Sequence, residues 1–262
     1  MKKIIISGSM AVAVAALVTG ATVAFFNDTE TSTGNTLTAG SIDLTVDSFG
    51  AMYNGVDVSQ QQTVWTARDL TTQKFFTFED VKPGDHGRRH ISLHADSNEA
   101  YACLLLANKS DQENVRTDPE IDAGDSTDVP GELSSNIEIF AWQDNDSDLN
   151  YEPQNLEAEL PRNGSFAVDS FFDITYDIDI ADSTSGTPVL VPTGPAATRN
   201  VGIAWCVGNM NVNQGDGTIT CNGAGGDKAQ TDSFEADVVL YAEQVRNNPN
   251  FKCEDVDLNP QS

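Results

Sequence analysis

The chain has 262 residues and is strongly acidic, with 40 Asp and Glu against 14 Lys and Arg and a formal net charge of −26. A surface with this charge repels phosphate backbones and anionic headgroups, which excludes nucleic acid and anionic lipid as partners. The length suits one large β domain or two small ones, and it is sufficient to bury a core. The acidity indicates solubility or a salt-rich habitat, and it also supplies carboxylates that can bind divalent cations.

The first 24 residues have the pattern of a signal peptide. Two lysines form a basic start, residues 4–23 carry no charge, and the small residue Ala24 precedes Phe25. We therefore predict a signal peptide at 1–24, cleavage between Ala24 and Phe25, and a secreted or cell-surface product. The segment is also long enough to span a bilayer, so an uncleaved anchor is the alternative. No later segment is apolar enough to span a membrane, so we expect no membrane attachment after cleavage.

Short stretches that alternate apolar and polar residues recur along the rest of the chain and predict β-strands. In chain order they are 42–46, 74–81, 90–94, 100–107, 137–142, 171–180, 201–207 and 234–245. Clusters of Gly, Pro, Asn and Asp separate them, as in the turns of antiparallel sheets. Helical periodicity is weak, and short helices are expected only at 61–70 and 155–160.

This pattern predicts an all-β fold, an antiparallel β-sandwich with long acidic loop insertions. We expect a single sandwich domain over 25–253 and an acidic tail at 254–262. The acidic stretch 110–135 contains Pro and Gly and is expected to form a long surface excursion.

Four cysteines in an exported chain predict disulfides. We favour Cys206 with Cys221, because the Gly- and Asn-rich segment between them suits a hairpin closed by a disulfide. Cys103 with Cys253 would then tie a central strand to the C-terminal end. A four-cysteine metal site is disfavoured, because such sites use close CxxC pairs and none is present.

An alternating run of oxygen-bearing side chains follows the apolar stretch that ends at Trp142 and predicts a calcium site. Asp144, Asp146 and Asp148 take the first, third and fifth places of a calcium loop, but the sixth place lacks its usual Gly. A glutamate would have to close the site. The candidate ligands are Asp144, Asp146, Asp148, Asn150, Glu152 and Glu157. The alternative is a solvated acidic turn.

The histidines are His86, His90 and His94, and their even spacing puts them on one face of a strand. An exposed polar face is the favoured interpretation of this pattern. We find no HExxH, GxSxG or Cys–His signature in the chain, so the sequence does not predict an enzyme.

Several segments together resemble the TasA/camelysin family. They are ATVAFFNDTETSTGN at 21–35, LTAGSIDL at 37–44, DVKPGD at 80–85, the WxDxDxD loop at 142–148 and AEQVRNNP at 242–249. The resemblance implies cleavage by a SipW-type signal peptidase, a jelly-roll-like sandwich, and secretion into the fibres of a biofilm matrix. Camelysin is described as a surface metallopeptidase, but this sequence shows no zinc signature to which that activity could be assigned.

The resemblance also implies self-assembly, in which the N-terminal segment of one subunit completes the sheet of its neighbour. Residues 25–40 are rich in Thr, lack Pro and become a free end on cleavage. An extended segment can add to a sheet edge, and head-to-tail addition makes a filament. The assembly residues would be Phe25, Phe26, Asn27, Asp28 and Thr29.

Alternatives to this assembly remain open. The N-terminal segment could instead be the first strand of its own sheet. The chain could also be a surface peptidase acting through His90 and His94, or a calcium-dependent surface adhesion module.

Overall fold

The computed structural model describes residues 27–32, 42–60, 64–77, 80–126, 130–160, 164–172, 178–194, 197–224 and 226–258. The predicted signal peptide, the cleavage point Ala24–Phe25 and the assembly residue Phe26 lie outside these ranges. Within them, no helix is long and apolar enough to cross a membrane.

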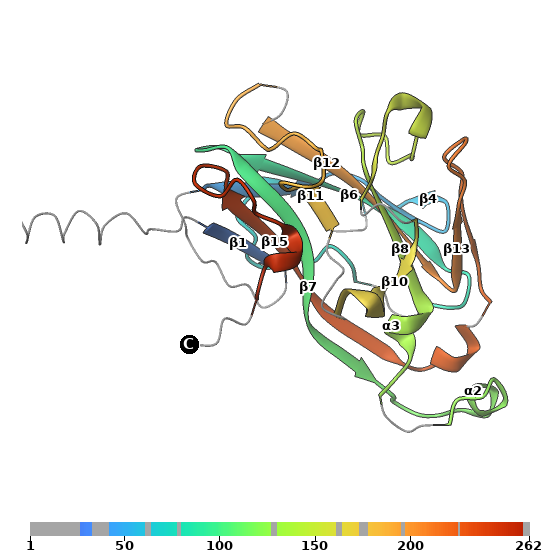
Figure 1. Cartoon of the computed structure of the whole chain (residues 1–262). Coiled ribbons are helices and arrows are strands. Elements are labelled where there is room, and N and C mark those ends of the chain that lie inside the picture. Colours follow the sequence, from blue (N-terminus) through green and yellow to red (C-terminus); the bar gives the residue numbers. More distant parts are fainter. Residues whose placement is uncertain are drawn as a thin grey trace, which may run out of the picture.

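The first of two large sheets has four strands in the order β1-β15-β7-β11, and every pairing is antiparallel. Its strands are β1 (Asn27–Ser32), β7 (Ala100–Gln112), β11 (Ile178–Ala181) and β15 (Ser233–Gln244). The long strands β7 and β15 form its centre, and in Figure 1 their ends run together toward α2.

The second large sheet has nine strands, with the path β10-β8-β12-β6-β2-β5 and the strands β3, β4 and β9 at its margins. Its strands are β2 (Leu44–Ser48), β3 (Ala51–Tyr53), β4 (Val56–Asp57), β5 (Trp65–Arg68), β6 (His86–Ala95), β8 (Ile137–Gln143), β9 (Glu159–Leu160), β10 (Phe166–Ala167) and β12 (Thr198–Val207). A separate hairpin joins β13 (Asn209–Val212) to β14 (Ile219–Asn222).

Helices are short and lie in the connections between strands. They are α2 (Asp118–Asp122), α3 (Leu133–Asn136) and the 3₁₀ helices η1 (Pro153–Asn155), η2 (Val168–Phe172), η4 (Gly226–Ala229) and η5 (Cys253–Asp255). The acidic excursion predicted at 110–135 thus contains the end of β7, α2 and most of α3.

Three sequence predictions of local structure were wrong. The stretch 155–160 is not a helix, because Leu156 adopts a left-handed φ of 64° that ends η1 after one turn. The stretch 61–70 contains β5, where Trp65 is buried and donates a hydrogen bond to the Val46 carbonyl. No strand forms in the described part of 74–81, although Phe75 is buried in the core.

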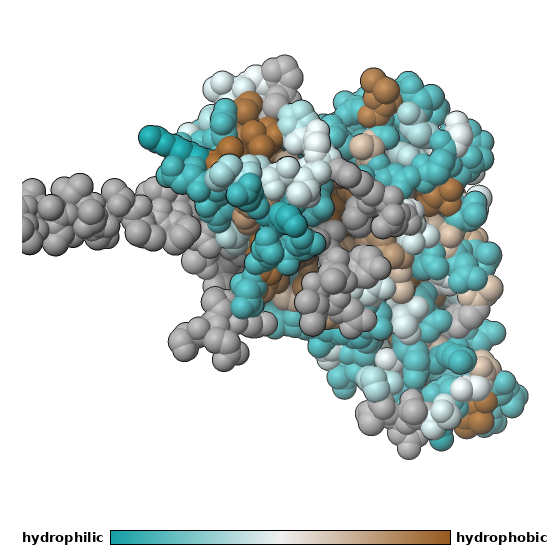
Figure 2. All heavy atoms as spheres, in the orientation of Figure 1, coloured by the Kyte–Doolittle hydropathy of each residue, from teal (hydrophilic) through white to brown (hydrophobic). Residues whose placement is uncertain are grey.

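The core lies between the two large sheets, which confirms the predicted all-β antiparallel sandwich. One sheet contributes buried side chains such as Leu104, Ile178 and Leu240, and the other contributes side chains such as Ile91 and Val201. In β2 the burial alternates along the strand, as expected for a strand with one face on the core. On the face that Figure 2 shows, the described residues are mostly hydrophilic.

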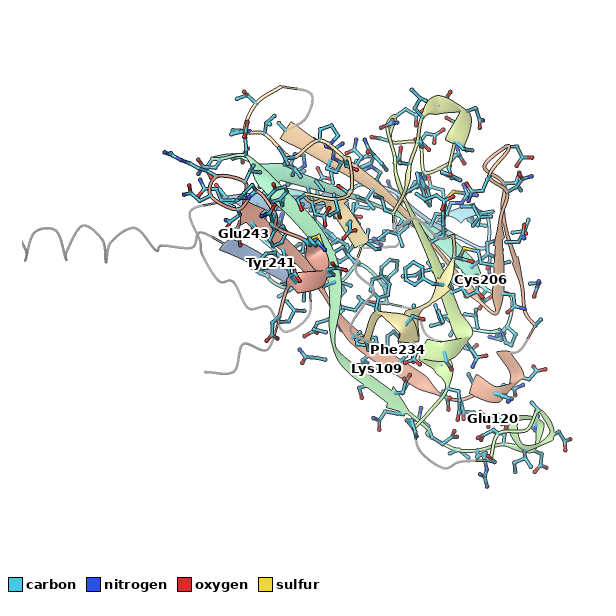
Figure 3. The ribbon with its side chains drawn as sticks, in the orientation of Figure 1. Lys109, Glu120, Cys206, Phe234, Tyr241 and Glu243 are labelled. Atoms are coloured by element: carbon cyan, nitrogen blue, oxygen red, sulfur yellow. A yellow bond between two sulfur atoms is a disulfide. The ribbon has the colours of Figure 1, made fainter. Side chains whose placement is uncertain are left out.

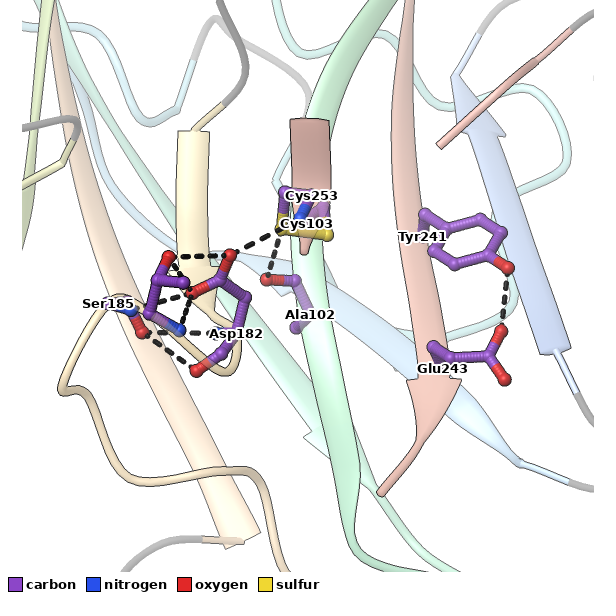
Figure 4. The surroundings of a disulfide bond; sticks show 8 residues. Ala102, Cys103, Asp182, Ser185, Tyr241, Glu243 and Cys253 are labelled. Atoms are coloured by element: carbon purple, nitrogen blue, oxygen red, sulfur yellow. Dashed lines mark hydrogen bonds between the residues drawn. A yellow bond between two sulfur atoms is a disulfide. The ribbon is translucent and has the colours of Figure 1, made fainter. Parts of the chain in front are cut away.

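The structure contains two disulfides, Cys103–Cys253 and Cys206–Cys221, which are the pairs predicted from the sequence. Cys253 lies against β7, where its backbone N–H donates to the Asp182 carboxylate at 3.3 Å (Figure 4). Cys103 and Cys253 form a small second core with Leu105 and Val239. The bond therefore fixes the C-terminal segment against the outer face of the four-stranded sheet.

The two disulfides should contribute unequally to stability. Cys103 and Cys253 are 150 residues apart, and Cys206 and Cys221 are 15 apart. In the chain-entropy model, removing the first pair by Cys103→Ala/Cys253→Ala costs about 5 kcal/mol and removing the second costs about 3 kcal/mol. Urea unfolding of the two double variants measures this difference, and an equal or reversed order would contradict the prediction.

Candidate functional site

The acidic loop at 144–150 begins where β8 ends and lies on the outer face of the nine-stranded sheet. The Asp144 N–H donates to the Asn200 carbonyl at 3.1 Å, and the Asn200 side chain donates to Ser147 Oγ at 2.9 Å. Leu149 fits over Gly50, where an added Cβ would lie 2.8 Å from Leu149 Cδ1. The loop is therefore seated on β12 and on the residue that precedes β3.

The buried carboxylate of Asp144 holds the backbone of this loop by hydrogen bonds. Asp144 is 1% exposed, and its two carboxylate oxygens accept the backbone N–H groups of Ser147 at 2.6 Å and Leu149 at 3.3 Å. Ser147 and Leu149 both adopt left-handed φ angles, of 65° and 68°. Because such angles are unfavourable for side chains with a Cβ, the hydrogen bonds from Asp144 help to hold the turn.

Three of the predicted ligands converge in this loop. Asp144, Asp146 and Asp148 each offer a carboxylate oxygen, and these oxygens lie within 4.8 Å of one another. Burial raises the pKa of Asp144, and the charges of Asp146 and Asp148 raise it further, against the two backbone hydrogen bonds that lower it. The arrangement thus concentrates negative charge around one buried carboxylate.

The other predicted ligands have different partners. Glu157, which is 5% exposed, accepts the N–H groups of Asn145 at 2.8 Å and Glu152 at 2.7 Å, so it closes the base of the loop. The Glu152 carboxylate accepts a hydrogen bond from the Asn155 side chain at 2.6 Å. Asn150 accepts one from Arg88 Nη1 at 2.9 Å. Neither glutamate belongs to the group of converging carboxylates.

Two basic side chains of β6 lie under the loop. Arg88 Nη1 also donates to the Leu149 carbonyl at 3.0 Å, and the nearby Asp148 favours its charged form although burial lowers its pKa. His90 is fully buried against Phe49, with its Nε2 3.8 Å from Asp144 Oδ2. Burial lowers the pKa of His90 to about 4, so its ring is neutral at pH 7.

The expectation that the three histidines form an exposed polar face was wrong for His90, because the acidic loop and Phe49 cover it. His94 is half-buried between Asp47 Oδ2, 3.1 Å from its Nε2, and Thr198 Oγ1, 3.0 Å from its Nδ1. Among the described residues, the metal-compatible groups contain no histidine. The hypothesis of a peptidase site at His90 and His94 gains no support from this geometry.

A second acidic group was missed by sequence reasoning. Glu113, Glu132 and Asp232 also offer oxygens that lie within 4.8 Å of one another. The available signal was the acidic excursion at 110–135, but Asp232 is far from it in the sequence. A further group, Asp179, Asp182 and Cys253, is not a thiolate site because Cys253 is disulfide-bonded.

Replacing Asp144 should destabilise the protein without any cation present. Asp144→Ala leaves two backbone N–H groups without their acceptor, which we expect to cost about 1–3 kcal/mol. Asp146→Ala is the matched control, because Asp146 is exposed and its loss should change stability by less than about 0.5 kcal/mol. Urea unfolding in chelator measures both, and equal effects would contradict the role of Asp144.

Comparison with known proteins gives a family for the chain. A search of curated proteins found no match. The family model described as camelysin metallo-endopeptidase matches residues 1–136, from the N-terminus through β7 and α2 to the end of α3. Because the match covers just over half of the 262 residues and agrees with the resemblance found in the sequence, the chain belongs to the TasA/camelysin family.

Proposed function

We propose that this protein is a secreted structural subunit that assembles head-to-tail into extracellular fibres by donating its N-terminal strand. The proposed sequence of events starts with cleavage at Ala24–Phe25 by a SipW-type signal peptidase, which frees the residues before β1. Membership of the TasA/camelysin family supports a secreted matrix or surface protein. The partner in assembly is a second copy of the same chain.

The observation that carries the proposal is the position of β1. It is one of the two edge strands of the four-stranded sheet, and within the described residues it pairs with β15 alone, from Asn27 opposite Glu243 to Ser32 opposite Val238. The residues expected to act in assembly therefore include the first three of this strand, Asn27, Asp28 and Thr29.

The edge of β15 needs a partner strand. Its central residues Val239, Leu240 and Ala242 are buried, and without β1 their backbone would form an open, apolar sheet edge that invites pairing with another chain. The position beside β15 at the edge of the sheet can be occupied by β1 of the chain itself or by β1 of a neighbouring subunit. The first arrangement gives a monomer, and the second gives an open filament.

The link between β1 and the rest of the domain is long enough for exchange. Nine residues, 33–41, connect Ser32 to Ile42. Fully extended, such a link reaches at most ~30 Å, which is sufficient to place β1 on the sheet edge of an abutting subunit.

A cross-link across this pairing distinguishes the two arrangements. Ser32 and Val238 are directly opposite in register, so Ser32→Cys/Val238→Cys should form a disulfide under oxidation. Filaments assembled from chain 25–262 are oxidised and run on a non-reducing gel. Strand donation predicts covalent ladders of many subunits, because each bond joins neighbouring chains.

Single Ser32→Cys is the control and can give dimers at most. Deletion of residues 25–40 should abolish the filaments seen by negative stain. Cross-linked monomers alone, or a strictly monomeric protein in every salt and calcium condition, would overturn the proposal.

Calcium binding by the acidic loop is a second part of the proposal. Supporting it are the three converging carboxylates Asp144, Asp146 and Asp148 and the hard oxygen ligands that calcium prefers. A bound cation would offset the burial of the Asp144 carboxylate and the nearby charges of Asp146 and Asp148, which together raise its pKa. Its expected role is to stiffen the loop over β6 and β12.

The loop site is tested by Asp146→Asn/Asp148→Asn, which leaves the hydrogen bonds of Asp144 in place. We expect this variant to bind one calcium ion fewer per chain than the parent, as counted by native mass spectrometry. Asp69→Asn/Asp96→Asn changes the net charge equally at two exposed positions and serves as the control. An unchanged calcium count in the loop variant would exclude calcium binding there.

A further inference from the structure

A cluster of five carboxylates lies beyond the ends of β7 and β15, away from the acidic loop. Glu113 directly follows β7 and Asp232 directly precedes β15. The last pair of that ladder is Gln112 opposite Ser233, so Glu113 and Asp232 occupy the next opposed positions. Two like charges facing each other across strands destabilise a sheet when nothing lies between them.

Glu132 joins this pair because the chain returns very close to the end of β7. An added Cβ at Gly131 would lie 2.7 Å from the Gln112 carbonyl and 2.9 Å from the Glu113 nitrogen, so only glycine fits there. The Glu132 N–H then donates to Asp232 Oδ2 at 2.5 Å. As a result, oxygens of Glu113, Glu132 and Asp232 lie within 4.8 Å of one another.

The segment between Glu113 and Gly131 adds two more carboxylates, Glu120 on α2 and Asp125 just after it. Both carboxylates lie close enough to Glu113 and Asp232 for their negative charges to act on that pair. Figure 3 shows Glu120 beyond the ends of β7 and β15. Two basic side chains of the described residues lie nearby, Arg116 with its Nε 4.0 Å from Asp125 Oδ2 and Lys228 with its Cε 4.0 Å from the position of a Cβ on Gly124. Their two positive charges are fewer than the five carboxylates.

Several oxygens of the cluster are buried without a hydrogen-bond donor. Glu120 is 0% exposed, and its Oε2 accepts the Thr117 N–H while its Oε1 has no donor within the described part of the chain. In the same residues, both oxygens of Glu113 and Oδ1 of Asp232 have no donor other than a proton shared between these two carboxyl groups. Burying carboxylate oxygens without donors costs folding free energy unless a cation binds them.

We propose that Glu113, Glu132 and Asp232 bind a calcium ion beside the buried carboxylates of Glu120 and Asp125, and that this ion ties the 113–132 excursion to the ends of β7 and β15. Calcium–oxygen distances of about 2.4 Å allow ligand oxygens up to about 4.8 Å apart around one ion. Carboxylates alone are hard ligands, which disfavours zinc and copper. Several carboxylates on one ion favour calcium over magnesium. Magnesium usually keeps several of its waters and binds only one or two carboxylates.

This site is independent of fibre assembly and of the 144–150 loop, so each can fail without the other. In the acidic loop, Asp144 already has two backbone donors. In the cluster, by contrast, Glu113 has none among the described residues. Bound calcium should therefore matter more for the local order of residues 113–132 than for the acidic loop.

The test uses chain 25–262 stripped with chelator and then given calcium or magnesium at constant ionic strength. The variant Glu113→Gln/Asp232→Asn removes two ligand charges and also removes repulsion, so we expect it to fold and to melt no lower than the parent in chelator. Native mass spectrometry should show one calcium ion fewer per chain than in the parent. Calcium should raise the melting temperature of the parent more than that of the variant.

A local readout separates this site from the acidic loop. Trypsin cleavage after Arg116, which lies inside the excursion, should slow at least several-fold when calcium is added to the parent, and the variant should lose this protection. Asp122→Asn, an exposed carboxylate on the same helix α2, is the matched control and should keep both the calcium and the protection. Asp146→Asn/Asp148→Asn should also keep the protection at Arg116.

Three results would overturn the proposal. The first is an equal calcium count in Glu113→Gln/Asp232→Asn and the parent. The second is cleavage at Arg116 that calcium does not change, which would mean that protons alone neutralise the cluster. The third is equal protection by magnesium at the same concentration, which would overturn the choice of calcium.

Discussion

The antiparallel ladder between β7 and β15 is the interaction on which most of the molecule depends. It runs from Ala100 opposite Gln244 to Gln112 opposite Ser233 and forms the centre of the four-stranded sheet. β11 pairs with β7 and β1 pairs with β15, so both outer strands need it. Cys103 lies in this ladder opposite Tyr241, and its disulfide to Cys253 holds the C-terminal segment against it. The register of the ladder also decides that Glu113 and Asp232 meet at its end.

The two acidic sites show how differently the same residue types can be used. In the 144–150 loop, Asp144 and Glu157 accept backbone N–H groups and Arg88 lies beneath, so hydrogen bonds within the chain define the loop. In the cluster at the end of the ladder, Glu113 and Asp232 face each other, and both Glu113 oxygens and Asp232 Oδ1 have no N–H donor among the described residues. The first arrangement keeps its shape from its own contacts. In the second, the strand register and the close approach at Gly131 bring the carboxylates together. A cation or bound protons must balance their repulsion.

The sequence predicted most of the sandwich, because strands such as β2 have one face on the core and alternate accordingly. It also predicted the disulfide pairs, since Cys206 and Cys221 flank a short turn-rich segment and leave one other pair. Local sequence patterns gave the wrong secondary structure where tertiary contacts determine it. At 61–70, pairing with β2 makes a strand of residues that were expected to be helical. The burial of His90 and the Glu113–Asp232 cluster could not be predicted. Both depend on which distant segments the strand register brings together.

The family match ends at residue 136. The matched residues 1–136 cannot form the four-stranded sheet without the rest of the chain. Within residues 1–136, β1 and β7 both belong to this sheet, but they do not pair with each other, because β15 lies between them. In the proposed assembly, β1 would be donated and β15 of the neighbour would receive it. These two strands thus come from opposite ends of the chain. The acidic cluster has the same division, with four carboxylates in the matched part and Asp232 outside it. Any change that shifts the register of β15 should therefore disturb the N-terminal strand, the C-terminal disulfide and the cluster together, because all three are positioned by that one strand.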